Sequence, residues 1–162
     1  MEPEGRRAGL SYIDGWSTML KAVSSAALFI VIVVLATLAA TGSLFGLSPA
    51  LIATQVAAAG LAVWARRSFP RGTFRVVATP GGETLMEKGP YRLIRHPMYS
   101  AALLLVWSGV VAHFALWTFC AGALATAVVV VRIVVEERLL QERYEGYGRY
   151  ARATKALIPF VA

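Results

Sequence analysis

The chain has 162 residues, of which 57% are hydrophobic and 15% are charged, and its net charge is +7. Two long segments, residues 22–65 and 97–131, contain no Asp, Glu, Lys or Arg. A soluble domain is about one quarter charged and carries polar residues along its helices. The pattern therefore argues against a soluble enzyme and is typical of a membrane protein. It also excludes intrinsic disorder, which requires low hydrophobicity.

The first uncharged segment is long enough for two membrane spans, because each span takes about 20 residues. Residues that favour turns divide it into residues 22–41 and 50–65, and these are Gly42, Ser43, Gly46, Ser48 and Pro49. A signal peptide is an alternative for the first span, but the apolar stretch is longer than such a peptide needs and another span follows. We expect a helical hairpin over residues 22–65.

The second uncharged segment holds two spans if it extends to residue 135, with a turn near His113. We therefore expect a second hairpin over residues 97–135. The whole chain, residues 1–162, is then a single membrane domain of the all-α class, an integral membrane protein with four transmembrane helices arranged as two hairpins.

All sixteen Lys and Arg lie in residues 1–21, 66–96 and 132–162, which this layout places on one side of the membrane. The positive-inside rule makes that side cytoplasmic. We expect a cytoplasmic N-terminal segment (1–21), a cytoplasmic connector (66–96) and a cytoplasmic C-terminal segment (136–162) with an amphipathic helix. Since topology explains the basic excess, we expect membrane lipid as a partner and no nucleic acid. The abundance of Ala, Val, Gly and Arg suggests a microbial plasma membrane.

The single cysteine and the two histidines limit the chemistry. One cysteine allows no disulfide within the chain. A zinc site made of His96, His113 and Cys120 is not expected, because the layout places His113 at the opposite membrane face from His96. We expect no metal.

Arg132 interrupts an apolar stretch and lies one helical turn before Glu136, so the two side chains share a helix face. A charge at this depth either faces the protein interior or extends to the membrane interface. The position alone leaves both interpretations open: an interfacial anchor with a surface salt bridge, or a functional residue.

The connector ends in a polar segment that leads into the third expected helix. Pro97 suits the first position of that helix, with Arg95 and His96 just before it. The first turn of a helix offers N–H groups and a positive dipole end, which favour a carboxylate or a phosphate. We expect a pocket at this point.

Two sequence motifs, separated by a defined spacing, are similar to those of a known protein family. The first is Gly89-Pro90-Tyr91-Arg92-x-x-Arg95-His96-Pro97-x-Tyr99, and the second, about forty residues later, is Glu136-Glu137-x-x-Leu140. Together they resemble the isoprenylcysteine carboxyl methyltransferase family, which belongs with the membrane phospholipid methyltransferases. The resemblance covers roughly residues 76–160. Ala101 stands where the family usually has Gly, which concerns helix packing more than cofactor binding.

The resemblance implies S-adenosylmethionine as cofactor, bound at the cytoplasmic ends of the last two spans. This cofactor carries a carboxylate, an ammonium, a sulfonium and an adenine, which suit N–H donors, a carboxylate and aromatic faces. The start of the third helix would take the carboxylate, and Glu136 the ammonium or ribose. The implied cofactor-binding residues are Thr84, Leu85, Met86, Tyr91, His96, Pro97, Met98, Tyr99 and Glu136.

The resemblance also implies that Arg132 orients the methyl acceptor. A carboxylate is ionised near neutral pH and needs no general base, whereas an amine must lose a proton and would be repelled by Arg132. We therefore favour methylation of a carboxylate on a lipophilic, isoprenylcysteine-like or prenylated acceptor from the bilayer. A lipid amine N-methyltransferase is the alternative. A sterol-reductase-like enzyme that uses NADPH and a non-catalytic membrane protein are further alternatives.

Several other residues have simpler interpretations. Tyr144, Tyr147 and Tyr150 are expected to form an aromatic belt at the membrane interface. Glu137 is expected to be structural or to face solvent, because Glu136 beside it points in a different direction.

Overall fold

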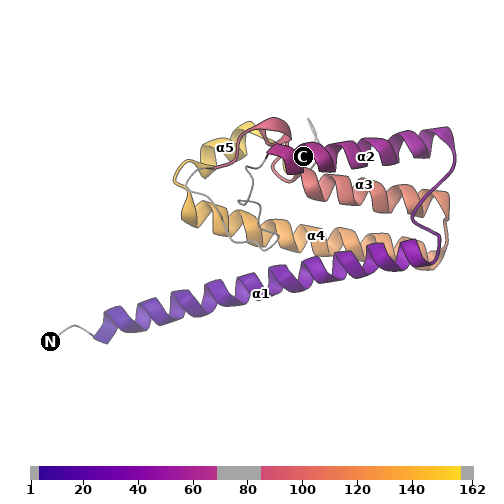
Figure 1. Ribbon diagram of the computed structural model, residues 1–162. Coiled ribbons are helices and arrows are strands. Elements are labelled where there is room, and N and C mark those ends of the chain that lie inside the picture. The colour runs from indigo at the N-terminus through magenta and orange to yellow at the C-terminus, as the bar shows by residue number, and fades with distance from the viewer. Residues whose placement is uncertain (1–3, 69–84, 158–162) are drawn as a thin grey trace.

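The computed structural model describes residues 4–68 and 85–157, except for the side chains of residues 4–18 and of residue 21. Five α-helices, one 3₁₀ turn and no strand occur in these residues, so the prediction of an all-α protein is confirmed (Figure 1). The elements are α1 (Glu4–Ala40), α2 (Pro49–Ser68), the turn η1 (Gly89–Arg92), α3 (Pro97–Ala112), α4 (Leu116–Arg143) and α5 (Tyr147–Ala153).

The turns lie where turn-forming residues predict them. Residues 41–48 separate α1 from α2, and residues 113–115 separate α3 from α4. Pro97 is the first residue of α3, where its missing N–H costs no helical hydrogen bond.

Two helices run beyond the segments that are expected to span the membrane. α1 begins at Glu4 and not near residue 22, so its 37 residues extend about 55 Å. α4 continues eight residues past position 135, to Arg143. Its last two turns consist largely of Glu, Arg, Leu and Gln, which are strong helix formers, and neither Pro nor Gly interrupts them.

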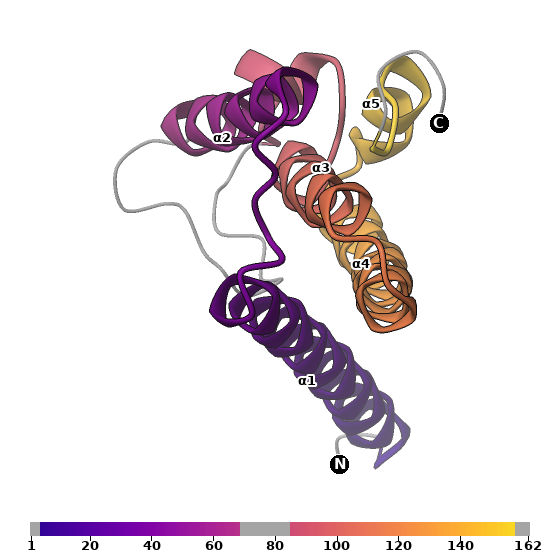
Figure 2. The same cartoon turned by 90° about the vertical axis from the view of Figure 1, so that its right-hand side faces the viewer.

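The helices do not pack as two hairpins. The most extensive contacts join α2 to α3 and α1 to α4, and α3 also packs against α4. Figure 2 shows the helices following one another around an arc in the order α2, α3, α4, α1. α1 and α2 are therefore joined by a turn without packing extensively against each other, whereas α3 and α4 also pack together.

Residues 41–48 carry the chain from α1 across the end of α3 to α2, and they pass over α3 at Gly109. A Cβ atom at position 109 would lie 2.6 Å from the carbonyl oxygen of Ser43 and 2.8 Å from that of Leu44. Since real Cβ atoms do not approach backbone atoms so closely, Gly109 allows the crossing. The chain can then reach the far side of α3, where α2 packs.

The two largest clusters of buried apolar side chains among the described residues join the helices. The first lies toward the turns and joins α1, α3 and α4 through residues that include Leu38, Val106 and Ala125. The second consists of Val31, Val129 and Ile133, and the partly buried Tyr99 packs against it. The second cluster therefore links the helical core directly to a residue of the first motif.

The outer surface of the long helices is apolar. In the described part of the chain, residues 22–40 of α1 and the whole of α4 are long and apolar enough to cross a membrane, and less than half of each apolar stretch is buried. Phe29, Ile32, Val130 and Val134 are among the exposed side chains. Exposed apolar surface of this extent is typical of contact with lipid. α2 and the 16-residue α3 do not meet the same criterion, so four spans remain a prediction.

Candidate functional site

The first turn of α3 lies beside α4 at the level of Arg132, so the two motifs come together. The hydroxyl of Tyr99 donates a hydrogen bond of 2.6 Å to Oε1 of Glu136. Nε of Arg132 donates to the same hydroxyl and lies 3.1 Å from Oε1 of Glu136. The guanidinium carbon also lies 5.6 Å from the centre of the Tyr99 ring. These three side chains form one connected polar cluster.

Arg132 is buried, with 3% of its surface exposed. Besides Tyr99 and Glu136, it donates from Nη1 to the backbone carbonyl of Ser24 in α1. The interpretation as an interfacial anchor with a surface salt bridge was therefore wrong. A buried guanidinium must be paired and hydrogen bonded to offset its loss of hydration, and here its partners come from three helices.

His96, the residue that precedes α3, lies between two carboxylates. Nδ1 is 3.7 Å from Oε2 of Glu136, and Nε2 is 3.3 Å from Oε1 of Glu137. The ring stacks on Tyr99 with 5.6 Å between ring centres, and 6% of the residue is exposed. Glu136 and Glu137 thus reach the same imidazole.

Glu137 was not among the predicted site residues. It accepts a hydrogen bond of 2.7 Å from Nε of Arg95, in addition to its contact with His96. The expectation of a structural role is consistent with this ion pair, but the expected divergence from Glu136 is not observed. The sequence signal was the adjacent Arg95-His96 pair, which offers one cation and one imidazole to two successive carboxylates.

Tyr91 lies in the turn η1, which packs against the end of α2. Gly89 has a φ of +61°, and a Cβ atom there would lie 2.1 Å from Oγ of Ser68, so only Gly fits. The turn buries Pro90 and Tyr91. Burial raises the pKa of the Tyr91 phenol, and electrostatic interactions with the nearby Tyr150 and Glu136 contribute to the increase. Tyr91 is therefore near the polar cluster.

The C-terminal segment, residues 147–157, crosses the same region. The hydroxyl of Tyr150 donates 2.8 Å to the carbonyl of Tyr91, and Oγ of Ser100 donates 2.6 Å to that of Leu157. Tyr147 and Tyr150 are 1% and 8% exposed. The prediction of an interfacial aromatic belt was wrong for these two residues, because both rings are buried within the protein and Tyr150 is bonded to the connector.

Burial raises the pKa of Tyr150 to about 12, although the nearby charge of Arg95 opposes the increase. Burial also raises the pKa of Tyr147, and the charge of Glu137 adds to this. Both phenols are therefore neutral at physiological pH and can act as hydrogen-bond donors.

Four of the remaining predicted cofactor residues lie in the described part of the chain, two in the first turn of α3 and two in the segment before η1. Pro97 is buried, and Met98 is half-buried in the first turn of α3. Leu85 and Met86 are half-buried in the irregular segment before η1. Thr84 lies outside the described residues.

The cluster suits the cationic part of S-adenosylmethionine better than its carboxylate. Glu136 and the faces of Tyr91 and Tyr99 match an ammonium or a sulfonium. Amides near the helix start are already used: those of Arg95 and His96 donate to Lys155 and Ala156, and those of Tyr99 and Ser100 donate to the carbonyl of His96. Within the described residues, Met98 is the one position of this turn whose amide has no such backbone acceptor.

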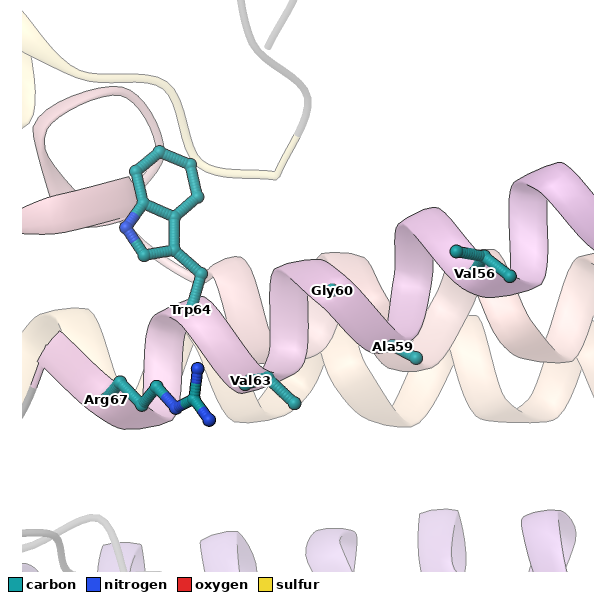
Figure 3. A pocket seen from close by; sticks show the side chains of 6 residues that line it. All are labelled: Val56, Ala59, Gly60, Val63, Trp64 and Arg67. Atoms are coloured by element: carbon teal, nitrogen blue, oxygen red, sulfur yellow. The ribbon is translucent and has the colours of Figure 1, made fainter.

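A cavity of about 540 Å³ lies along α2 (Figure 3). Its lining residues are Val56, Ala59, Gly60, Val63, Trp64 and Arg67, all from that one helix. None of the predicted site residues lines it. The cavity is therefore a separate feature of the surface.

A comparison with protein-family models matches residues 44–146 of the chain to the family described as phospholipid methyltransferase. The match runs from the turn after α1 to the end of α4 and includes all three residues of the cluster, Tyr99, Arg132 and Glu136. Comparisons with curated proteins and with solved structures gave no match. Membership implies S-adenosylmethionine as methyl donor and does not favour the reductase alternative. The predicted relationship to membrane methyltransferases is confirmed, and the chain belongs to the phospholipid methyltransferase family.

Proposed function

We propose that the protein is an S-adenosylmethionine-dependent methyltransferase that methylates a carboxylate on a lipophilic, isoprenylcysteine-like acceptor. The observation that carries this proposal is the position of Arg132. It is a buried cation with apolar residues on both sides of it in α4, and it contacts both Tyr99 and Glu136. A fixed positive charge beside a candidate donor site favours a negatively charged acceptor.

For the donor side, the proposal assigns binding to His96, Tyr99, Glu136 and Tyr91. Glu136 would hold a cationic group, and the ring of Tyr99, fixed by its hydrogen bond to Glu136 and its stacking on His96, would face the sulfonium. When bound, the cofactor supplies an electrophilic methyl group. The half-buried Met98, Leu85 and Met86, the buried Pro97, and Thr84, whose structure is not described, would complete the apolar and polar surroundings.

For the acceptor side, the proposal assigns alignment to Arg132. A carboxylate accepts a methyl group without losing a proton, so the residues need only hold it in line and exclude water. A guanidinium binds both oxygens of a carboxylate through its planar fork. Arg132 would bind the acceptor carboxylate while its contacts to Tyr99 and Ser24 fix the orientation of the guanidinium group.

A phospholipid amine is the second candidate acceptor, and the name of the family favours it. An amine must be deprotonated before it reacts, and Arg132 disfavours an ammonium nearby. Glu136 and Glu137 are candidate proton acceptors in that case. Glu136, however, already accepts a hydrogen bond from Tyr99. Hydrogen bonds from His96 and Arg95 hold the pKa of Glu137 well below its usual range, which makes Glu137 a weaker base.

The membrane layout that accompanies this proposal has four spans within one domain and the polar cluster on the cytoplasmic side of a microbial plasma membrane. The length of α4 supports it: a span of about 20 residues that begins at Leu116 ends near Val135, directly before Glu136. The last turn of α2, which carries Arg66 and Arg67, lies at the same end of the molecule as the start of α3 and the end of α4 (Figure 1). The positive-inside rule then makes that side cytoplasmic.

Methyl-labelled S-adenosylmethionine tests the function directly. Membranes containing the protein are incubated with the labelled donor, first with a farnesylated cysteine peptide and then with phosphatidylethanolamine vesicles. The proposal expects base-labile label in the peptide and little label in the lipid. Acid-stable, base-stable label in the lipid would favour the amine alternative, and no transfer to any lipid or peptide fraction would contradict the proposed function.

A further inference from the structure

The pair formed by Arg95 and Glu137 connects three segments that surround His96. Nε of Arg95 donates 2.7 Å to Oε1 of Glu137 on α4. Nη1 donates 2.8 Å to the carbonyl of Ala151 and 2.5 Å to that of Thr154. These carbonyls lie at the C-terminal end of α5, where carbonyls lack helical partners and where a cation is stabilised by the helix dipole.

The same segments are also joined through the backbone. The amide of Arg95 donates 2.7 Å to Lys155, and that of His96 donates 3.1 Å to Ala156. The amide of Lys155 donates 3.1 Å back to Leu93. The position of the His96 backbone therefore depends on residues about sixty positions later in the chain.

The charge on Glu137 determines which atom donates in its contact with His96. Oε1 of Glu137 is shared by Nε of Arg95 and Nε2 of His96. A carboxylate paired with a guanidinium is ionised and can only accept hydrogen bonds. Nε2 of His96 must therefore carry the hydrogen of this contact, and the ring orientation that follows directs Nδ1 toward Glu136.

We infer that Glu137 is a positioning residue of the donor site. Glu137 is held by Arg95, and its carboxylate fixes the hydrogen of His96 on Nε2. It thereby also fixes the ring orientation that places the His96 imidazole against Glu136 and Tyr99. As a statement about the donor site, the inference rests on the proposed function. Its account of the imidazole stands independently of any ligand. Glu137 itself acts through His96.

Two measurements test the inference. The chain has two histidines, and His113 lies at the opposite end of α3, so protein labelled with ¹⁵N-histidine gives a site signal and an internal reference. The wild-type protein in detergent at neutral pH should show a hydrogen on Nε2 of His96. In Glu137→Gln the nitrogen shifts of His96 should change, because a carboxamide no longer requires that hydrogen, while those of His113 stay constant.

The second measurement is the affinity for S-adenosylmethionine by calorimetry, which should fall about tenfold or more in Glu137→Gln, since hydrogen bonds to charged groups are worth about that factor. Glu142→Gln, an exposed carboxylate on the same helix, is the matched control and should bind like the wild type. Arg95→Lys should weaken binding as well, because lysine lacks the planar fork.

The outcomes separate this inference from the proposed function. If the wild type does not bind the cofactor, the proposed function fails, whereas the nitrogen shifts still decide the role of Glu137. Unchanged shifts of His96 in Glu137→Gln would overturn the inference, as would tight binding by that variant. If the variant does not fold, the wild-type spectrum alone decides, since a hydrogen on Nδ1 without one on Nε2 contradicts the proposed geometry.

Discussion

The two ends of the α3–α4 hairpin are held together by different forces. At one end, charged side chains pair across segments, as in the cluster of Arg132, Glu136 and Tyr99. At the other end, apolar side chains pack together and the backbone makes close contacts. Gly109 lies against the carbonyls of Ser43 and Leu44, and Nε2 of His113 lies 2.9 Å from the carbonyl of Phe45.

This difference indicates that one end of the hairpin mainly stabilises the fold and that the other mainly serves the candidate site. Close backbone packing at the turns needs no charge and stabilises helices that have apolar surroundings. Buried charges cost hydration and add little net stability, so they are retained where they serve a site. We therefore expect substitutions at the charged end to impair methyl transfer and substitutions at the turn end to impair folding.

The largest effect is expected for Arg132→Ala. The substitution removes the cation proposed to align the acceptor, so methyl transfer should fall by about 10²- to 10³-fold, as for loss of a preorganised charge-stabilising donor. Cofactor affinity should decline much less, because Tyr99 still donates to Glu136. Transfer of labelled methyl groups and calorimetry measure the two effects.

Arg138→Ala is the matched control for this prediction. Arg138 is an exposed arginine on the same helix, six residues later, and its removal should leave both quantities within about twofold. An equal loss of cofactor affinity and transfer in Arg132→Ala would show that Arg132 supports the donor site and not the acceptor.

The next largest effect is expected at the turn end, for Gly109→Ala. The added Cβ would lie 2.6 Å and 2.8 Å from two backbone oxygens, and neither can move without shifting residues 41–48. Overpacking of this kind costs about 1–3 kcal/mol. Thermal unfolding in detergent should show the loss, while the folded fraction retains its cofactor affinity.

Gly60→Ala separates this steric effect from the general preference of helices for alanine. Gly60 lies within α2, and a Cβ atom there would have nothing within 4 Å. The substitution should leave stability unchanged or raise it by up to about 1 kcal/mol. Similar destabilisation in both variants would contradict the distinction between the two ends.

The comparison also shows what the sequence could and could not predict. Local signals were reliable: Pro97 begins α3, the turn falls at His113, and Arg132 and Glu136 share a face because they are four residues apart. The pairing of α1 with α4 was missed. It depends on contacts such as that between Arg132 and Ser24, 108 positions apart, for which no local pattern exists.

The C-terminal tyrosines were misassigned for a related reason. Tyr147 and Tyr150 have the amphipathic character that suits a membrane interface, but the same character suits a buried ring with a hydrogen-bonded hydroxyl. Only the position of α5 over the connector distinguishes these cases, and that position depends on Arg95 and on the pairing of residues 93–96 with 155–156.

The smallest predicted effect concerns the hydrogen bond from the Tyr150 hydroxyl to the carbonyl of Tyr91. This hydrogen bond joins two uncharged groups, although it lies at the charged end of the hairpin. Tyr150→Phe removes it and should lower the free energy of unfolding by about 1 kcal/mol. It should also change the response to alkali. Because the folded-state pKa of Tyr150 is raised to about 12, its contribution is fully present below the unfolded value of about 10 and is lost as the pH rises toward 12.

The stability of the wild type, measured by denaturant unfolding in detergent, should therefore decrease between about pH 10 and 12. In Tyr150→Phe the decrease should be smaller but should persist, since burial also raises the pKa values of Tyr91 and Tyr147. An identical decrease in both proteins would mean that the Tyr150 hydroxyl is not held by the connector. The C-terminal segment would then be joined to the site only through Arg95 and the backbone pairing.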